Sequence, residues 1–270
     1  MVKVPVVRSA VSSIRQVSKR VRNCKVINAR FQTGLPQVLK EKSVRVCITS
    51  PPYKEEDGFS VQMMEELSEL LDVYMADTSL FFMNFGHLAR DKGQPFRCAD
   101  VIAKHFDWIE TITWVKIQWS PVAKKVKTRL DNKTEFVFMF GRGDYELDRD
   151  AIGIEYIDKS NIGRYSNQDV HCAGNFWLVF DDVWFMKYQT VQKRSQKRHE
   201  ARFPRELPRK CLKLSAPILK DKDIVLDPFL GSGTTLKVVA EEFPDLCGVG
   251  AEMLKGHYDR SIEWLKEKGS

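Results

Sequence analysis

Two short motifs, far apart along the chain, combine residue types and spacings that could do chemistry. The first is Thr49-Ser-Pro-Pro-Tyr53, in which Pro51 and Pro52 fix the backbone and leave carbonyl oxygens without partners. The Pro51 carbonyl and the Ser50 hydroxyl are acceptors suited to a substrate amino group, whose delocalised lone pair makes it a poor nucleophile. Tyr53 adds a flat face for stacking. The motif predicts chemistry at an amino group, and a rigid structural loop is the alternative.

The second motif, Asp227-Pro-Phe-Leu-Gly-Ser-Gly-Thr-Thr235, has the small residues of a turn where the backbone approaches a ligand and free N–H groups face an anion. It does not end in the Gly-Lys-Ser/Thr of a Walker loop, and it lacks the third glycine of G-x-G-x-x-G. Farther along, Glu252 ends the next predicted strand, where an acidic side chain can accept hydrogen bonds from ribose hydroxyls. These residues predict a turn for a nucleotide-like or carboxylate-bearing cofactor. For Glu252 alone, an exposed carboxylate is the alternative.

Hydrophobic periodicity and turn residues predict the α/β elements that position these motifs. A strand over 44–48 runs directly into the first motif and a strand over 223–227 into the second, so each motif lies at the carboxyl end of a strand. Strands at 108–115 and 134–140 follow one another without a helix, which indicates an antiparallel edge on a mostly parallel, doubly wound sheet. The other predicted elements are strands at 25–27, 79–86 and 246–252 and helices at 35–40, 61–77, 95–106, 205–219, from 234 and from about 257.

Composition and charge limit the number of domains, the kind of partner and the location that the chain can have. The chain has 270 residues, 43% hydrophobic and 29% charged, which predicts one domain with an insertion. A net charge of +7 favours a polyanionic partner, although the signal is weak by itself. No apolar run approaches the roughly 20 residues of a membrane span and no secretory signal is visible, so we expect no membrane partner and a cytoplasmic location in a prokaryote or phage-infected host. The 6 scattered cysteines form no C-x-x-C pair, which indicates reduced thiols and no metal site.

With both motifs in place, the chain resembles the amino-group DNA methyltransferases of the permuted β class, in which a catalytic S-P-P-Y precedes a cofactor-binding D-P-F-x-G-S-G-T-T. Asn28-Ala-Arg30 is similar to the D-A-R of that family, and 199–207 is similar to its H-x-x-x-F-P-x-x-L. Glu252 and Tyr258 fit the E and Y that follow. The resemblance covers residues 25–142 and 199–265, and S-P-P-Y is similar to the cytosine-N4 branch.

The resemblance implies a Rossmann-like enzyme that transfers a methyl group from S-adenosylmethionine to the N4 amino group of cytosine in duplex DNA, after the base is flipped out. It implies a catalytic half over 25–142, a target-recognition region over 143–198 and a cofactor-binding half over 199–270. The implied catalytic residues are Ser50, Pro51, Pro52 and Tyr53. The implied cofactor residues are Asn28, Ala29, Thr49, Phe203, Asp227, Phe229, Gly231, Ser232, Gly233, Thr234 and Glu252, of which Asp227 and Phe229 are mainly structural supports.

One departure affects the cofactor site. Asn28 stands where the family has an aspartate that accepts a hydrogen bond from the adenine amino group. An amide oxygen can accept the same bond, so we expect weaker cofactor binding. By the same resemblance, the residues that line the methionine end of the cofactor are Phe203, Ser232, Gly233 and Thr234. The methionine carboxylate is stabilised by the positive end of a helix dipole. The implied partners are double-stranded DNA and a cognate restriction endonuclease, with the chain a monomer or a homodimer.

Basic residues gather in three stretches, 1–24, 124–129 and 193–198, the last of which ends a longer segment without periodicity. Residues 1–24 contain no acidic residue, which is typical of a flexible arm, a phosphate-facing helix or a solvated tail. Residues 143–198 lose periodicity and lie outside the resemblance, so we expect them to select the DNA sequence. Two basic clusters are expected to contact DNA phosphates, with a solvated surface as the alternative. They are Lys124, Lys125, Lys127 and Arg129, and Lys193, Arg194, Lys197 and Arg198.

Other functions are less compatible with these residues. An adenine-N6 enzyme of the same class is the nearest alternative, and it usually has Asp or Asn where Ser50 stands. A cytosine-C5 enzyme needs a cysteine nucleophile, commonly after proline, and no Pro-Cys occurs in the sequence. A catalytically silent DNA-binding relative, or an enzyme acting on RNA or a protein glutamine, remains open. The two intact motifs argue against the silent form.

Overall fold

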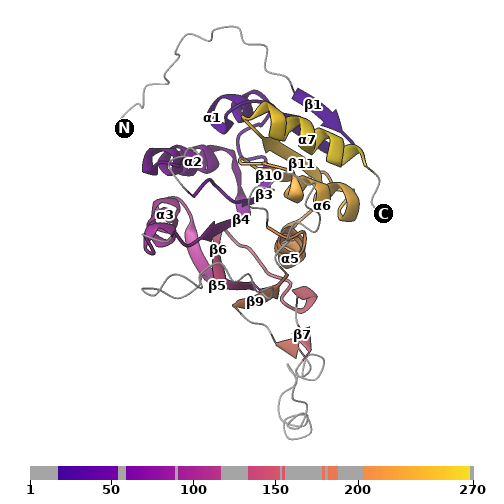
Figure 1. The fold of residues 1–270 in the computed structure, drawn as a ribbon. Helices are drawn as coiled ribbons and strands as arrows, with labels where there is room; N and C mark the ends of the chain where they lie inside the picture. The colour runs from indigo at the N-terminus through magenta and orange to yellow at the C-terminus, as the bar shows by residue number, and fades with distance from the viewer. Residues whose placement is uncertain are drawn as a thin grey trace, which may run out of the picture.

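The computed structural model describes residues 18–53, 59–88, 91–116, 133–152, 154–155, 178–179, 182–187 and 203–267. Within these residues, a nine-stranded sheet of order β1-β2-β11-β10-β3-β4-β6-β5-β9 forms the centre of the molecule (Figure 1). Its strands are β1 (Ser18–Val21), β2 (Cys24–Ile27), β3 (Val44–Thr49), β4 (Met75–Gly86), β5 (Asp107–Lys116), β6 (Thr134–Arg142), β9 (Val183–Met186), β10 (Ile224–Asp227) and β11 (Cys247–Ala251). β7 (Ile154–Glu155) and β8 (Leu178–Val179) pair separately.

The strand directions confirm the α/β class and the antiparallel part of the sheet. From β2 through β11, β10 and β3 to β4, each strand runs parallel to its neighbour. β6 runs antiparallel to both β4 and β5, so β5 runs in the same direction as β4. β9 lies at one edge, parallel to β5, and β1 lies at the other, antiparallel to β2.

Helices cover both faces of this sheet (Figure 1). One face carries α1 (Phe31–Gly34), α2 (Val61–Tyr74) and α3 (Gln94–Ile102), and the other carries α5 (Glu206–Leu214), α6 (Thr234–Glu242) and α7 (Lys255–Lys266). β4 contributes to both cores because successive residues of a strand point to opposite faces: Phe81, Met83 and Phe85 face the first, and Leu80 and Phe82 face the second. Burying each such side chain contributes about 1.5–3 kcal/mol. In the part of the chain that is described, no helix is long and apolar enough to cross a membrane.

Several elements differ from the expectation drawn from sequence. Residues 18–21, expected within a basic arm, form β1, whose Val21 is buried. The first short helix lies at 31–34 and continues as a 3-10 turn over 35–37, upstream of its predicted position. β9 belongs to the main sheet although it comes from the segment expected to be an insertion, because Trp184 and Met186 are buried in the core.

A buried lysine joins the last helix to the rest of the molecule. Lys237 on α6 is 2% exposed and donates a hydrogen bond to the Glu267 carbonyl (2.7 Å) and another to the Trp264 carbonyl. Its charge is paired with Glu241 at 2.9 Å. The Arg22 guanidinium, next to β1, also donates to the Glu267 carbonyl at 2.7 Å. The end of α7, whose last carbonyls need hydrogen-bond donors, is therefore held by two cations.

Candidate active site

The functional residues gather at one edge of the sheet, which follows from the strand directions. In a parallel sheet the carboxyl ends of all strands lie at the same edge, where ligands usually bind. Ser50 follows β3, Asp227 ends β10 and Glu252 follows β11. Because β6 is antiparallel, its first residues reach that same edge, so Glu135 lies there too. Lys116, the last residue of β5, reaches the edge beside it.

The Ser-Pro-Pro-Tyr motif forms a turn whose tyrosine is supported on one side. The Tyr53 ring stacks on Phe85 with centroids 4.6 Å apart and planes 23° apart. Its hydroxyl lies 2.8 Å from Ser50 Oγ, and the Gln94 amide donates to its main-chain carbonyl at 3.2 Å. Pro51 is buried, whereas Ser50 and the Tyr53 ring are partly exposed. Ser50 and Tyr53 are therefore the residues of this turn that are partly open to a ligand.

Gly86, the last residue of β4, makes room for this ring. A Cβ atom there would lie 2.7 Å from Tyr53 Cε2 and 3.4 Å from Glu135 Cδ. The first distance is shorter than two carbon atoms tolerate without a shift of the ring. The position of Tyr53 therefore depends on the missing side chain of Gly86.

Three polar residues near Tyr53 were not predicted from the sequence. The Tyr53 hydroxyl is 3.2 Å from Asn84 Oδ1 and 3.3 Å from Glu135 Oε2. Asn84 Nδ2 donates to the Phe136 carbonyl at 3.0 Å, and Lys116 Nζ lies 2.6 Å from Glu135 Oε1. A usable signal was present, because Asn84 interrupts the apolar run 80–85 and Glu135 directly precedes the apolar run 136–140. Buried polar side chains in such positions need specific partners.

The environment keeps the Tyr53 hydroxyl protonated. Burial raises the pKa of Tyr53 well above its usual value, and the charge of Glu135 raises it further. Hydrogen bonds from Ser50 and the Gly86 backbone act in the opposite direction and do not outweigh burial. Tyr53 is therefore a neutral phenol at physiological pH, able to donate one hydrogen bond and to accept others.

The side chain of Glu252 joins the glycine turn to the start of α7 on the other side of the site. Its Oε2 accepts a hydrogen bond from the Gly231 N–H at 2.8 Å, and its Oε1 accepts one from the Leu254 N–H at 2.7 Å. The side chain is almost fully buried, with the residue 8% exposed. Glu252 is therefore a buried acceptor fixed between the glycine turn and the start of α7.

The amide of Asn28 has a role that an aspartate could not take. Asn28 Nδ2 donates to the Glu252 carbonyl at 2.9 Å and to the Met253 carbonyl at 3.3 Å. A carboxylate in its place would face two carbonyl oxygens without a proton to share. With the NH₂ group directed at these carbonyls, the amide oxygen is directed away from them and can accept a bond from a ligand.

The glycine turn begins α6 without any side-chain cap. Gly231 and Gly233 have φ angles of 53° and 89°, the left-handed region that glycine enters without strain. Gly233 is the N-cap of α6 and no side chain bonds to the N–H groups of the first turn. Those groups and the helix dipole can therefore face an anion. Ser232 is partly exposed, and Thr234 is buried.

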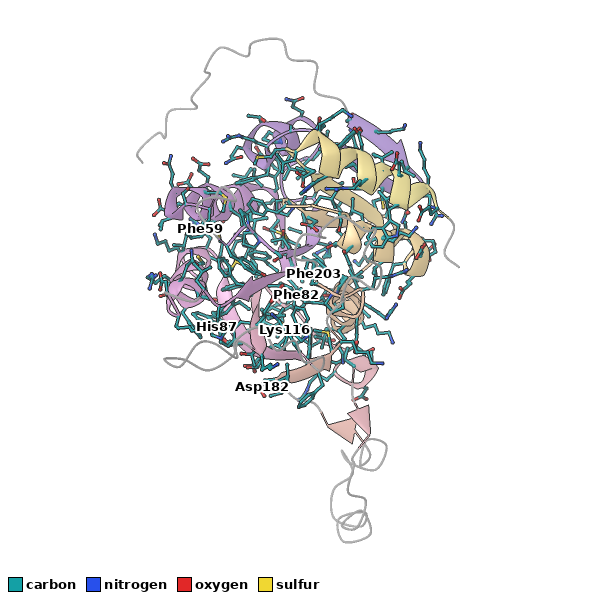
Figure 2. All side chains as sticks on the ribbon, viewed as in Figure 1. Phe59, Phe82, His87, Lys116, Asp182 and Phe203 are labelled. Carbon is teal, nitrogen blue, oxygen red and sulfur yellow. The ribbon has the colours of Figure 1, made fainter. Side chains whose placement is uncertain are left out.

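The other residues expected around the cofactor differ in how far they are buried. Phe229 is partly buried and contacts Phe31 edge to face, with centroids 5.0 Å apart. Phe203 is partly buried and packs against the α5–α7 core, near the start of α5 (Figure 2). Ala29 is partly buried on the opposite face, in the core that contains α1. Thr49 is fully buried.

Asp227 connects the two halves of the site. Its Oδ1 accepts hydrogen bonds from Thr49 Oγ1 at 2.7 Å and from the Phe229 N–H at 3.2 Å. Its Oδ2 accepts from Thr235 Oγ1 at 2.8 Å, and the residue is 1% exposed. Both carboxylate oxygens are thus bonded inside the protein. Asp227 holds β3 against the glycine turn and the first helical turn of α6.

The charge of Asp227 predicts a pH-dependent stability. Burial raises its pKa from the usual 3.8 to about 6, despite the three hydrogen bonds that lower it. The folded state therefore binds this proton more tightly than the unfolded state, so the contribution of Asp227 to stability decreases as pH rises through this interval. The Asp227→Asn variant keeps an acceptor for Thr49 and a donor for Thr235 without the charge. Relative to that variant, the parent should lose about 3 kcal/mol of unfolding free energy between about pH 3 and pH 8, as measured by urea unfolding. Parallel pH curves for the two proteins would contradict this assignment.

Four of the five cysteines among the described residues are buried and do not provide a nucleophile. Burial raises the pKa of Cys24 and of Cys98 to about 12, and it raises the pKa of Cys47 and Cys211 well above the usual value. A thiol reacts as its thiolate, so these groups are inert at physiological pH. In the same described portion, no group of three or more His, Cys, Asp or Glu could hold a metal ion.

The basic clusters lie outside the residues that the structure describes. They are Lys124, Lys125, Lys127 and Arg129, and Lys193, Arg194, Lys197 and Arg198. Their predicted contacts with DNA phosphates stay a prediction.

Comparisons with known proteins identify the family and the fold. A family model, N6_N4_Mtase, described as DNA methylase, matches residues 44–262. The Type II methyltransferase M.MwoI of Methanothermobacter wolfeii is 28% identical over 223 residues, and the match covers 74% of this chain and 28% of that protein. Among solved structures, the cytosine-N4-specific PvuII DNA methyltransferase is 18% identical with a TM-score of 0.68, over 92% of this chain and 88% of that one. M1.HpyAVI, solved with SAM, is 19% identical with a TM-score of 0.54, over 89% and 98%.

Proposed function

Because the chain belongs to the N6_N4_Mtase family of DNA methylases, we propose that it transfers a methyl group from S-adenosylmethionine to the N4 amino group of cytosine in duplex DNA. The observation that carries this proposal is the junction at Asp227. Its carboxylate bonds Thr49, which precedes the Ser-Pro-Pro-Tyr turn, and Thr235, which follows the glycine turn. A site for an amino group and a site for a cofactor are thereby joined by one side chain.

The residues present fit S-adenosylmethionine. The Glu252 carboxylate, whose oxygens accept from the Gly231 and Leu254 N–H groups, is the kind of acceptor that suits ribose hydroxyls. The Asn28 amide oxygen can accept from the adenine amino group. The N–H groups of the first turn of α6, which begins at Thr234 without a side-chain cap, suit the methionine carboxylate, beside Ser232 and Phe203. When bound, the cofactor supplies an electrophilic methyl group on a positively charged sulfur.

The residues of the turn prepare the amino group. The Pro51 carbonyl and Ser50 Oγ accept hydrogen bonds from its two N–H groups, which favours the tetrahedral nitrogen that attacks the methyl carbon. These acceptors are placed before the reaction, so no reorganisation is needed. Tyr53, supported by Phe85, stacks on the base after it leaves the helix, since a paired base cannot reach such a site.

The choice of cytosine rests on Ser50. A neutral hydroxyl beside the Pro51 carbonyl accepts from the amino group without placing a carboxylate near the O2 and N3 acceptors of cytosine. An aspartate in that position would repel both acceptors. The PvuII enzyme, named as cytosine-N4-specific, has the same fold over most of this chain, which is compatible with the assignment.

DNA recognition is assigned to segments outside the methylase motifs. The two basic clusters, in 124–129 and 193–198, would contact backbone phosphates, and the segment 143–198 would select the sequence. The Type II names of relatives such as M.MwoI support a place in a restriction–modification system, with a cognate endonuclease as partner.

The product nucleoside tests the proposed reaction. Duplex DNA is incubated with the protein and tritiated S-adenosylmethionine, digested to nucleosides and separated. We expect the label in N4-methylcytosine, because the neutral Ser50 side chain suits cytosine. Label in N6-methyladenine would refute the base and leave the enzyme class intact. Label in 5-methylcytosine would overturn the direct attack by the amino nitrogen.

A further inference from the structure

A continuous row of polar groups leads from Ser50 into the β4–β6–β5 part of the sheet. Ser50 Oγ is 2.8 Å from the Tyr53 hydroxyl, which is 3.3 Å from Glu135 Oε2. On its other oxygen, Glu135 is paired with Lys116 at 2.6 Å. The side chains of Glu135 and Lys116 are 11% and 20% exposed, so the row ends close to solvent. It starts at the atom that, in the proposed function, accepts from the target amino group.

Resting on that proposed function, we propose that Glu135 accepts the proton that the target amino group loses, and that Ser50 and Tyr53 relay it. The amino nitrogen uses its lone pair to form the C–N bond, and the electron pair of the broken S–C bond stays on sulfur. One N–H bond then breaks, with its electron pair returning to nitrogen. The proton passes to Ser50 Oγ, the Ser50 proton to the Tyr53 oxygen, and the Tyr53 proton to Glu135 Oε2. Glu135 ends as a neutral carboxylic acid.

The neighbours of Tyr53 single out Glu135 as the end of the relay. Asn84 Oδ1 is as close to the hydroxyl, at 3.2 Å, but a neutral amide can accept a hydrogen bond without keeping a proton. Ser50 is a weak base for the same task. Tyr53 cannot serve alone, because its raised pKa keeps it a phenol that can take up a proton only by giving away its own.

The charges around Glu135 are compatible with this role. Lys116 approaches from β5 and balances the carboxylate before the reaction. His87, just past β4 and labelled in Figure 2, also lies at this end of the sheet, because the charges of Glu135 and Lys116 both act on its pKa. Burial is the main cause that lowers the pKa of His87, with Lys92 and Lys116 acting in the same direction and Glu135 opposing them. His87 is therefore neutral at physiological pH and leaves Lys116 as the main cation on Glu135.

Glu135→Gln tests the proton acceptor directly. The glutamine amide is about the same size as the glutamate carboxylate and can still accept a hydrogen bond from the Tyr53 hydroxyl. It cannot keep the proton that the relay delivers. We expect the single-turnover rate of DNA methylation to fall by about 100-fold, the lower range of general base catalysis. The dissociation constants for DNA and for S-adenosylhomocysteine should stay at the parental values. Glu69→Gln, an exposed glutamate on α2, is the matched control and should methylate at the parental rate. A parental rate in Glu135→Gln would overturn the proposal.

Tyr53→Phe tests the relay separately from stacking. This variant keeps the ring on Phe85 and removes only the hydroxyl, so it should be slowed like Glu135→Gln. Because both changes interrupt one relay, the double variant should be no slower than either single variant. A parental rate in Tyr53→Phe, or additive losses in the double variant, would show that no proton passes through this hydroxyl.

Chemical rescue distinguishes a proton acceptor from a structural support. In Glu135→Ala, formate is small enough for the space left by the side chain, and its addition should increase the methylation rate with formate concentration. A loss without rescue, with thermal stability lowered in parallel, would indicate that Glu135 only holds the fold. The parent is assayed in the same experiment: if it does not label N4-methylcytosine the proposed function fails, whereas a labelled product with parental rates in the variants refutes the relay alone.

Discussion

Tyr53→Ala should lower kcat for DNA methylation by about 100-fold or more, because the loss of one base-stacking contact costs about 1–3 kcal/mol and the hydroxyl is lost as well. The cofactor contacts proposed here involve Glu252, Asn28 and the glycine turn, none of which bonds to Tyr53. The affinity for S-adenosylhomocysteine should therefore stay close to the parental value. Steady-state kinetics with duplex DNA and calorimetry with the cofactor product measure the two effects.

Gly86→Ala offers an independent way to disturb the same ring. The added methyl group would lie 2.7 Å from Tyr53 Cε2, so the ring must shift although no functional group is removed. Turnover should fall while cofactor affinity stays unchanged. Gly256→Ala on α7 is the matched control, because a Cβ there meets nothing within 4 Å. If Tyr53→Ala and Gly86→Ala both methylate at the parental rate, the turn has only a structural role.

Glu252→Ala should weaken S-adenosylmethionine binding by about 1–3 kcal/mol, which is about 5- to 150-fold in Kd. In the proposed function the carboxylate accepts from the ribose, and it also accepts from the Gly231 and Leu254 N–H groups. Its loss therefore removes the ribose contact and releases both the glycine turn and the start of α7. Calorimetric titration measures the change in Kd, and thermal unfolding of the free protein shows whether the variant is folded.

The matched variants separate the charge of Glu252 from its shape. Glu252→Gln keeps one acceptor oxygen and nearly the same volume, and we expect an intermediate loss of affinity. Glu263→Ala removes an exposed glutamate from α7 and should bind the cofactor like the parent. Parental affinity in both Glu252 variants would remove this residue from the cofactor site.

Local sequence was sufficient to find the two motifs, and the reason is physical. The Pro51-Pro52 pair restricts the backbone wherever it occurs, and the left-handed conformations at Gly231 and Gly233 need glycine in almost any fold. Hydrophobic periodicity placed most strands and helices within a few residues, because each element buries one face or both. The strand β10 and the turn after it were predictable for these reasons together.

The residues that complete the site depend on register, which a single sequence does not reveal. Glu135 reaches Tyr53 only because it pairs with Gly86 across β4 and β6, and Lys116 reaches Glu135 only because β5 is the next strand. Neither pairing follows from the spacing along the chain, since strands 107–116 and 134–142 could add to the sheet in other orders. Asn84 could be recognised as an unusual polar residue, but its partner could not.

The strand order also bears on how the protein folds during synthesis. The two strands that end at the cofactor loops, β10 and β11, come last in the chain and insert between β2 and β3. Thr49 and Asp227 are 178 positions apart, and Asn28 and Glu252 are 224 apart. Until those last strands have left the ribosome, β2 and β3 each have an unpaired edge facing the gap, which is a template for pairing with another chain. Pairs so distant in sequence close large loops and form slowly, so the nascent chain should depend on chaperones and aggregate readily when its translation stops before residue 224.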